Sequence, residues 1–244
     1  MRYLLTSLLC VFTLSLTAQV DCQGPDFNND SIIGAADIIV FLTYYGNEWP
    51  LAPEFVCGET IAHQDYAYST VQIGEQCWFA ENCRYLPSVS PPSTFSNTDP
   101  YYYVYGYEGT DVASAMSTSN YETYGVLYNW PAVMTEGICP SGWHVPSDGE
   151  FTELTDYLGG ELVAGGKMKD DVLWNGSNSS GWTGLPGGYR YSGGFDSYVL
   201  FGEWWSASES GSYSWSRELS FINGNVNRFN DTRNYGFSAR CVRD

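Results

Sequence analysis

The stretch SYSWSRELSFINGNVNRF, residues 212–229, decides the fold of the C-terminal part of this chain. Large side chains between Trp215 and Leu219 alternate with serine and glutamate, which is the period-two pattern of a β-strand with two different faces. Asn223-Gly224 separates this run from a second strand-like run, and an Asn-Gly pair in such a position predicts a β-hairpin. The sequence therefore predicts an antiparallel sheet near the C-terminus.

Upstream of this hairpin, residues 59–211 show the same short strands and frequent turns. The run 67–73 alternates toward a turn at Gly74-Glu75, and the aromatic run 101–107 favours a second strand. The best helix candidate is 148–158, because Ser147 and Glu150 have the spacing of a capping box. With 26 Gly and 11 Pro, loops should dominate. The sequence thus predicts an α+β domain with a twisted antiparallel sheet, few helices and long loops.

The first 18 residues have the pattern of a secretory signal. Arg2 precedes an apolar core from Leu4 to Leu16, and Ala18 ends a small-residue cleavage site. This apolar run is shorter than the roughly 20 residues that a helix needs to span a bilayer. We therefore expect a mature chain that begins at Gln19 and is secreted or displayed at the cell surface, without membrane insertion.

The mature chain keeps an even number of cysteines, which in an exported protein predicts disulfide bonds. They are Cys22, Cys57, Cys77, Cys83, Cys139 and Cys241. We expect Cys22–Cys57 to close a small N-terminal module and Cys77–Cys83 to bridge a tight loop. The third expected pair, Cys139–Cys241, would join a C-terminal strand to the segment before the helix.

Residues 26–37 carry oxygen-bearing side chains at the positions that a calcium loop requires. The expected ligands are Asp26, Asn28, Asp30 and Asp37, with the backbone carbonyl of Ile32. The stretch resembles one calcium-binding half of a dockerin repeat, and the module with its proline-containing linker covers 19–58. Only one half is present, so a cohesin partner is not expected. The alternative is an Asx-rich turn that caps an ordinary helix. Calcium is the cofactor that the sequence predicts.

Charge and histidine content bear on partners and on catalysis. The chain has 28 acidic and 10 basic residues and a net charge of −18 at pH 7. Such a surface repels nucleic acid and anionic lipid, so neither is an expected partner. A Cys–His nucleophile needs a free thiol, yet the six cysteines pair off, and only two histidines are present. Pairs of carboxylates arise by chance among 28 acids, so we assign no catalytic residue and expect no enzyme.

Six ordered motifs between about residue 60 and the C-terminus resemble the Fibrobacter succinogenes major paralogous domain. They are QCWFAEN (76–82), YGVLYNW (124–130), CPSGWHVPS (139–147), LPGGYR (185–190), WWSASE (204–209) and GFSARCVRD (236–244). The resemblance implies a domain over 59–244 that is related to C-type-lectin-like and formylglycine-generating-enzyme-like folds. It brings no established activity.

A C-terminal surface is the best candidate for recognition, because residues 204–235 are rich in Tyr, Trp, Ser and Asn. Aromatic side chains give contact area at low entropic cost, while amides and hydroxyls give adaptable hydrogen bonds. The candidate ligand-binding residues are Tyr213, Trp215, Arg217, Asn225, Asn227, Arg228, Asn230, Asp231 and Asn234. The alternative is that the aromatic residues are core and the asparagines form turns.

Two functions remain open from the sequence. The first is a binding module for a glycan or an extracellular protein. A lectin-type calcium site would need a Glu-Pro-Asn-like triplet, which the chain lacks, so sugar binding would depend on aromatic stacking. The second is a structural component of the cell surface that assembles with other subunits, including copies of itself.

Overall fold

The computed structural model describes residues 35–36, 38–39 and 55–244. Residues 55–244 form one compact unit, and the four described residues before it are helical. The predicted signal peptide, the calcium ligands from Asp26 to Asp37, Cys22 and the linker lie outside the described residues. The compact unit is therefore the part of the chain on which the fold and the site can be built.

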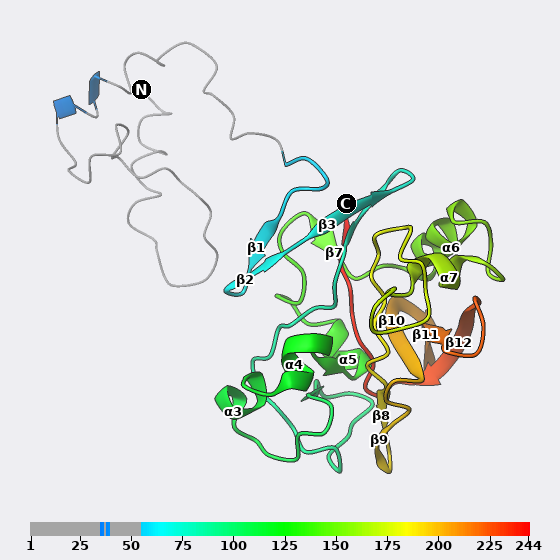
Figure 1. The fold of residues 1–244 in the computed structure, drawn as a ribbon. Coiled ribbons are helices and arrows are strands. Elements are labelled where there is room, and N and C mark those ends of the chain that lie inside the picture. Colours follow the sequence, from blue (N-terminus) through cyan, green and yellow to red (C-terminus); the bar gives the residue numbers. More distant parts are fainter. Residues whose placement is uncertain (1–34, 37, 40–54) are drawn as a thin grey trace. The chain divides into compact units, whose positions relative to one another are not determined.

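Short strands and short helices alternate along this unit (Figure 1). The strands are β1 (Ile61–His63), β2 (Tyr66–Tyr68), β3 (Thr70–Ile73), β4 (Gln76–Phe79), β5 (Tyr102–Tyr103), β6 (Leu127–Tyr128), β7 (Trp143–His144), β8 (Tyr189–Tyr191), β9 (Gly194–Asp196), β10 (Phe201–Ser210), β11 (Tyr213–Ser220), β12 (Val226–Thr232) and β13 (Val242–Arg243). The helices are α3 (Val112–Met116), α4 (Ser119–Tyr124), α5 (Trp130–Val133), α6 (Asp148–Tyr157) and α7 (Ala164–Met168).

Two sheets organise the unit. One has the strand order β3-β4-β13-β7, which brings the C-terminal strand between β4 and β7. The other has the order β10-β11-β12 and contains the longest strands. The pairs β1-β2, β5-β6 and β8-β9 form two-stranded sheets, and every strand pair is antiparallel. The predicted α+β class is confirmed.

The β11–β12 hairpin is present, but its connection is longer than the Asn-Gly pattern predicts. Strand β11 ends at Ser220 and β12 begins at Val226, so five residues, 221–225, connect the strands. The ammonium of Lys169 accounts for the length of this loop, because Nζ donates to the carbonyls of Ser220 and Asn223 at 2.8 Å each. A two-residue turn would leave no place for this buried cation.

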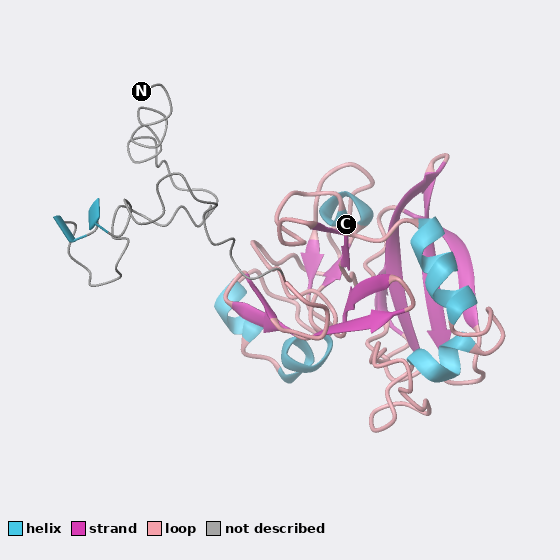
Figure 2. Cartoon of the chain, turned by 90° about the horizontal axis from the view of Figure 1, so that it is seen from above, coloured by secondary structure: helices cyan, strands magenta, loops and turns pink. Residues whose placement is uncertain are grey.

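Helix α6 is the element that the sequence predicts most closely. Ser147 Oγ accepts from the amide of Glu150, and the Glu150 side chain accepts from the amide of Ser147, which completes the capping box. Phe151 and Leu154 on its inner face are fully buried. In Figure 2 the helix lies along one face of the β10-β11-β12 sheet.

The β10-β11-β12 sheet lies between two hydrophobic cores. Trp204 and Trp205 are adjacent in β10, so their side chains point to opposite faces. Trp204 packs with Trp182 at 4.8 Å between ring centroids, in the core beneath α6. Trp205 packs on Phe237 at 4.4 Å, in the other core. Strand β10 is therefore buried on both sides.

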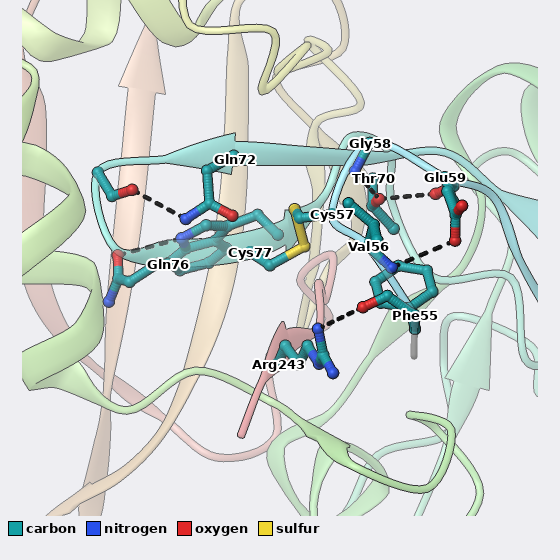
Figure 3. The surroundings of a disulfide bond; sticks show 12 residues. Phe55, Val56, Cys57, Gly58, Glu59, Thr70, Gln72, Gln76, Cys77 and Arg243 are labelled. Atoms are coloured by element: carbon teal, nitrogen blue, oxygen red, sulfur yellow. Dashed lines mark hydrogen bonds between the residues drawn. A yellow bond between two sulfur atoms is a disulfide. The ribbon is translucent and has the colours of Figure 1, made fainter. Parts of the chain in front are cut away.

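The disulfides of the described unit correct two of the three expected pairs. Cys57 bonds to Cys77 (Figure 3), so the expected Cys22–Cys57 and Cys77–Cys83 pairs are wrong, whereas Cys139–Cys241 is present as expected. Cys77 lies in β4, whereas Cys83 lies beyond the end of that strand, where its amide donates to the carbonyl of Ala239 at 2.9 Å. Cys83 is a buried thiol instead, with its Sγ 3.5 Å from Cys241 Sγ.

The Cys57–Cys77 pair forms because the segment before β1 is held against β3. The amide of Gly58 donates to Thr70 Oγ1 at 2.9 Å, and Thr70 Oγ1 donates to the carbonyl of Glu59 at 2.7 Å (Figure 3). These bonds fix Cys57 beside β4, where Cys77 is its neighbour.

Candidate functional site

The predicted ligand-binding residues divide between the two faces of the β10-β11-β12 sheet. Trp215 pairs with Asn230 and Arg217 with Arg228, and cross-strand partners share a face. Asn227 and Asp231 alternate with these residues along β12, so they lie on the opposite face. The remaining three are Tyr213 at the start of β11, Asn225 before β12 and Asn234 after it. The sequence set is therefore not one surface.

The face that carries Arg217 is used to hold helix α6. Asp148 lies 2.8 Å from a nitrogen of Arg217 and 2.8 Å from one of Arg228. Hydrogen bonds from Arg228, then from Arg217, hold the pKa of Asp148 below its usual range although burial opposes this. The Arg228 guanidinium also lies 3.4 Å from the centroid of the Trp215 ring. Arg217 is buried in this network, so its guanidinium is not free to contact a ligand.

The opposite face contains a cleft of about 270 Å³ that we call the acidic aromatic cleft. Strand β8, all three strands of the sheet and the segment after β12 each contribute to it. Its lining residues are Tyr189, Tyr191, Glu203, Glu218, Phe229, Asp231, Tyr235 and Phe237. Of the predicted set, Asp231 lines this cleft, and Asn227 contributes indirectly through a hydrogen bond to Glu218.

Three carboxylates gather in the acidic aromatic cleft. Glu203 and Glu218 are direct partners across β10 and β11, which places their Cβ atoms about 5 Å apart. Burial raises the pKa of Glu203 well above its usual range, and the charges of Asp231 and Glu218 add to the effect. Burial is also the main cause of the raised pKa values of Glu218 and Asp231. The three groups therefore resist full ionisation together.

Hydrogen bonds satisfy two of these carboxylates and leave the third without a donor. Asn227 Nδ2 donates to Glu218 Oε1 at 2.8 Å, and Ser216 Oγ donates to Asp231 Oδ2 at 2.6 Å. Glu203 is only 7% exposed, and no donor within residues 55–244 reaches its carboxylate. The ion pairs of that segment include none of the three groups.

Aromatic rings form the walls of the cleft. Tyr189 and Tyr235 lie edge-on to Phe237, with ring centroids 6.2 and 5.9 Å away. Phe237 is buried on Trp205, so this wall is anchored in the core. Phe229 on the other side is 47% exposed and presents its ring to solvent. The cleft thus combines rigid apolar walls with acceptor oxygens.

A second hollow, of about 340 Å³, lies beside β12 and the segment before α7. It is lined by Glu161, Leu162 and residues 225–229. Among its lining residues, Arg228 is already bound to Asp148, and Asn227 to Glu218. Because these side chains have partners, this hollow is the weaker candidate.

Sequence reasoning missed Glu203, Glu218 and the tyrosines of β8. One local signal was available: Glu203 stands in the run FGEWWS, where every residue from Gly202 to Ser206 is buried. A carboxylate within a buried strand needs a partner or a function. The tyrosines of β8 carried no such signal, because only tertiary packing brings them to β10.

No metal site is found within the described residues, where no cluster of His, Cys, Asp and Glu side chains has the geometry to hold an ion. The cleft carboxylates are included in that statement. The predicted calcium ligands lie outside this part of the chain, so calcium binding stays a prediction.

The fold and the cleft of residues 55–244 define a disulfide-crosslinked α+β domain with a small acidic pocket. The chain belongs to the Fibrobacter succinogenes major domain family, whose model matches residues 71–243. No curated protein matches the chain, and no solved structure does. Within the described residues, no helix is both long and apolar enough to cross a bilayer.

Proposed function

We propose that this chain is an exported, non-catalytic binding module that recognises a glycan through the acidic aromatic cleft. The observation that carries the proposal is the combination of aromatic walls with three carboxylates that have no ion-pair partner within residues 55–244. Sugar hydroxyls donate hydrogen bonds to carboxylates, and the apolar face of a sugar ring packs on aromatic side chains. A cleft of about 270 Å³ suits one or two sugar rings of a longer chain.

A non-catalytic role is supported by the protonation behaviour of the carboxylates. Glycoside hydrolysis needs one protonated and one ionised carboxyl group, whose environments push their pKa values apart. Here burial raises the pKa values of Glu203, Glu218 and Asp231 in the same direction. Within residues 55–244, no cation pairs with a cleft carboxylate to hold it ionised, as one would for a nucleophilic carboxylate.

Several finer features belong to the same proposal. The N-terminal pattern and the two disulfides are compatible with a protein that functions outside the cytoplasm. We propose a C-type-lectin-like arrangement for residues 59–244, in line with the sequence resemblance. The dockerin-like loop would bind one structural Ca²⁺ through Asp26, Asn28, Asp30, Ile32 and Asp37 and would serve as a spacer or tether.

The test is a glycan array of the mature chain, followed by isothermal titration with each hit. Phe229→Ala removes an exposed wall of the cleft and is expected to weaken binding by about tenfold. Tyr213→Ala is the matched control, because it is 49% exposed where Phe229 is 47% exposed, on the other face of the sheet. Equal losses in both variants, or binding lost only in Tyr213→Ala, would rule out the cleft.

Self-assembly is the second candidate, and an exposed apolar patch favours it. The amide of Phe221 donates to the carbonyl of Leu200 at 2.8 Å, which brings two loops together. Val199, Leu200 and Phe221 are each about half exposed and Ile222 is 82% exposed. Contiguous apolar surface of this kind is typical of an interface. Light scattering at two protein concentrations tests it, because Ile222→Asp should lower the measured mass only if the patch is buried in an assembly.

A further inference from the structure

The acidic aromatic cleft carries a charge that the folded protein itself does not neutralise. Glu203, Glu218 and Asp231 come from three adjacent strands, and no lysine, arginine or histidine of residues 55–244 pairs with any of them. The nearby guanidiniums of Arg217 and Arg228 lie on the opposite face of the sheet, where Asp148 binds them. Within residues 55–244, therefore, no cation compensates this charge when the three groups are ionised.

Glu203 is the group that points to a ligand. Its residue is 7% exposed, it lines the cleft, and its carboxylate accepts no hydrogen bond from the described residues. A buried polar group without a partner costs free energy, and a buried charge costs more. Glu203 lines an accessible cleft, where an incoming donor can supply the hydrogen bond that its carboxylate lacks.

We infer that the acidic aromatic cleft binds a protonated primary amine, and that the glycan recognised there carries free amino groups. An ammonium group has three donors and no acceptor, which suits a cleft whose charged groups are all carboxylates. The aromatic walls add cation–π attraction to the same positive charge. This inference rests on the proposed glycan-binding function and specifies its ligand.

Two other ligand chemistries fit the cleft less well. A divalent cation would need a ligating cluster, and the described residues provide none. A neutral sugar would satisfy hydrogen bonds but would leave the repulsion among Glu203, Glu218 and Asp231 unrelieved. A cation relieves that repulsion directly, because opposite charges at close range favour the ionised form of a carboxyl group.

The experiment compares three probes by isothermal titration with the mature chain: a glucosamine oligosaccharide, its fully N-acetylated counterpart and Nα-acetyl-lysine amide. We expect the free amine oligosaccharide to bind at least about tenfold more tightly than the acetylated one, since acetylation removes a charged hydrogen bond. Raising the salt concentration should reduce this preference.

Glu203→Gln is the decisive variant, and Glu153→Gln is its control. Both replace one carboxyl group by an amide, but Glu153 is exposed on α6 away from the cleft. Glu203→Gln should abolish the preference for the amine while the control retains it. Gln is nearly isosteric and uncharged, so we expect the Glu203→Gln midpoint of thermal unfolding to be unchanged or higher. Phe229→Ala provides a second cleft variant at an exposed position.

The outcomes separate this inference from the proposed function. Equal binding of both oligosaccharides, or a preference that survives Glu203→Gln, overturns the amine and leaves glycan binding intact. Binding of the lysine derivative alone supports the amine and overturns the glycan, since the partner would then be a protein. Binding of no probe, with no hit on the glycan array, overturns both.

Discussion

Removing the Cys139–Cys241 disulfide is expected to lower the free energy of unfolding by about 4.7 kcal/mol, and removing Cys57–Cys77 by about 3.3 kcal/mol. These values follow from the chain-entropy relation, in which a crosslink stabilises by restricting the unfolded chain in proportion to the logarithm of loop length. The two loops differ because the cysteines are separated by 102 residues in one pair and by 20 in the other. The difference between the two losses, about 1.4 kcal/mol in the free energy of unfolding, is the quantity that tests the dependence on loop length most directly.

The assay must control for Cys83, whose Sγ lies 3.5 Å from Cys241 Sγ. In a Cys139→Ala variant the freed Cys241 thiol could be oxidised to a disulfide with Cys83 by oxidised glutathione. That bond would close an even longer loop and restore most of the lost stability. Each pair is therefore replaced by alanine in a Cys83→Ala background, which also serves as the reference.

Urea unfolding followed by tryptophan fluorescence gives the free energies, because the chain has nine tryptophans and several are buried in both cores. The reasoning is refuted if loss of Cys57–Cys77 costs as much as loss of Cys139–Cys241. A second comparison treats the Cys139→Ala variant and the Cys139→Ala/Cys83→Ala variant with oxidised glutathione. The reasoning is also refuted if the two are then equally unstable and the Cys83 and Cys241 thiols of the Cys139→Ala variant can still be titrated.

Three further results are expected. Burial disfavours the charged form of His144, but hydrogen bonds to Asp244 and Glu150 outweigh burial and raise the pKa of His144. His144 therefore stabilises the fold fully below about pH 6.5, and this contribution is lost as the pH rises through the higher pKa of the folded state. His144→Gln should therefore lower the unfolding midpoint more at about pH 5 than at about pH 9, and an equal loss at both would contradict this. Asp148→Ala leaves the Arg217 cation buried without a carboxylate, so it should lower the free energy of unfolding in urea by about 3 kcal/mol or more. A decrease below about 1 kcal/mol, which is typical of a surface ion pair, would argue against the network. Isothermal titration of the mature chain with Ca²⁺ should show one site that Asp26→Ala removes, and no heat of binding in the unmodified chain would refute the calcium loop.

The sequence was sufficient where structure depends on neighbouring residues. Helix α6 begins at its predicted capping box, since Ser147 and Glu150 interact within one turn. The β3–β4 hairpin turns at Gly74, where the sequence predicts a turn after the alternating run 67–73, and the φ of 61° suits glycine. In both cases the determining contacts lie within a few positions along the chain.

The cysteine pairs and the cleft could not be predicted in the same way, because they depend on contacts between distant segments. Cys57 meets Cys77 only because Thr70 bonds to the segment before β1. The cleft forms only when the register of the β10-β11-β12 sheet sets Glu203 opposite Glu218 and β8 packs beside them. The Tyr, Trp, Ser and Asn content of residues 204–235 indicated the part of the chain that contributes to the cleft. The alternation of side chains along β11 and β12, however, places Trp215 and Asp231 on opposite faces of the sheet.

The distribution of cations argues that the unpaired carboxylates of the cleft have a function. The chain has only 10 lysines and arginines for 28 acids, yet several of these cations are committed to backbone carbonyls. Arg190 is buried and donates to the carbonyls of Pro92 and Asn234, and Lys169 donates to those of Ser220 and Asn223. Burial, and then repulsion from Asp231 and Glu218, raise the pKa of Glu203, and one such cation placed beside it would oppose both effects and stabilise the free protein. A fold that leaves this position open trades stability for a charged pocket, and such a trade is typical of binding sites rather than of structural cores.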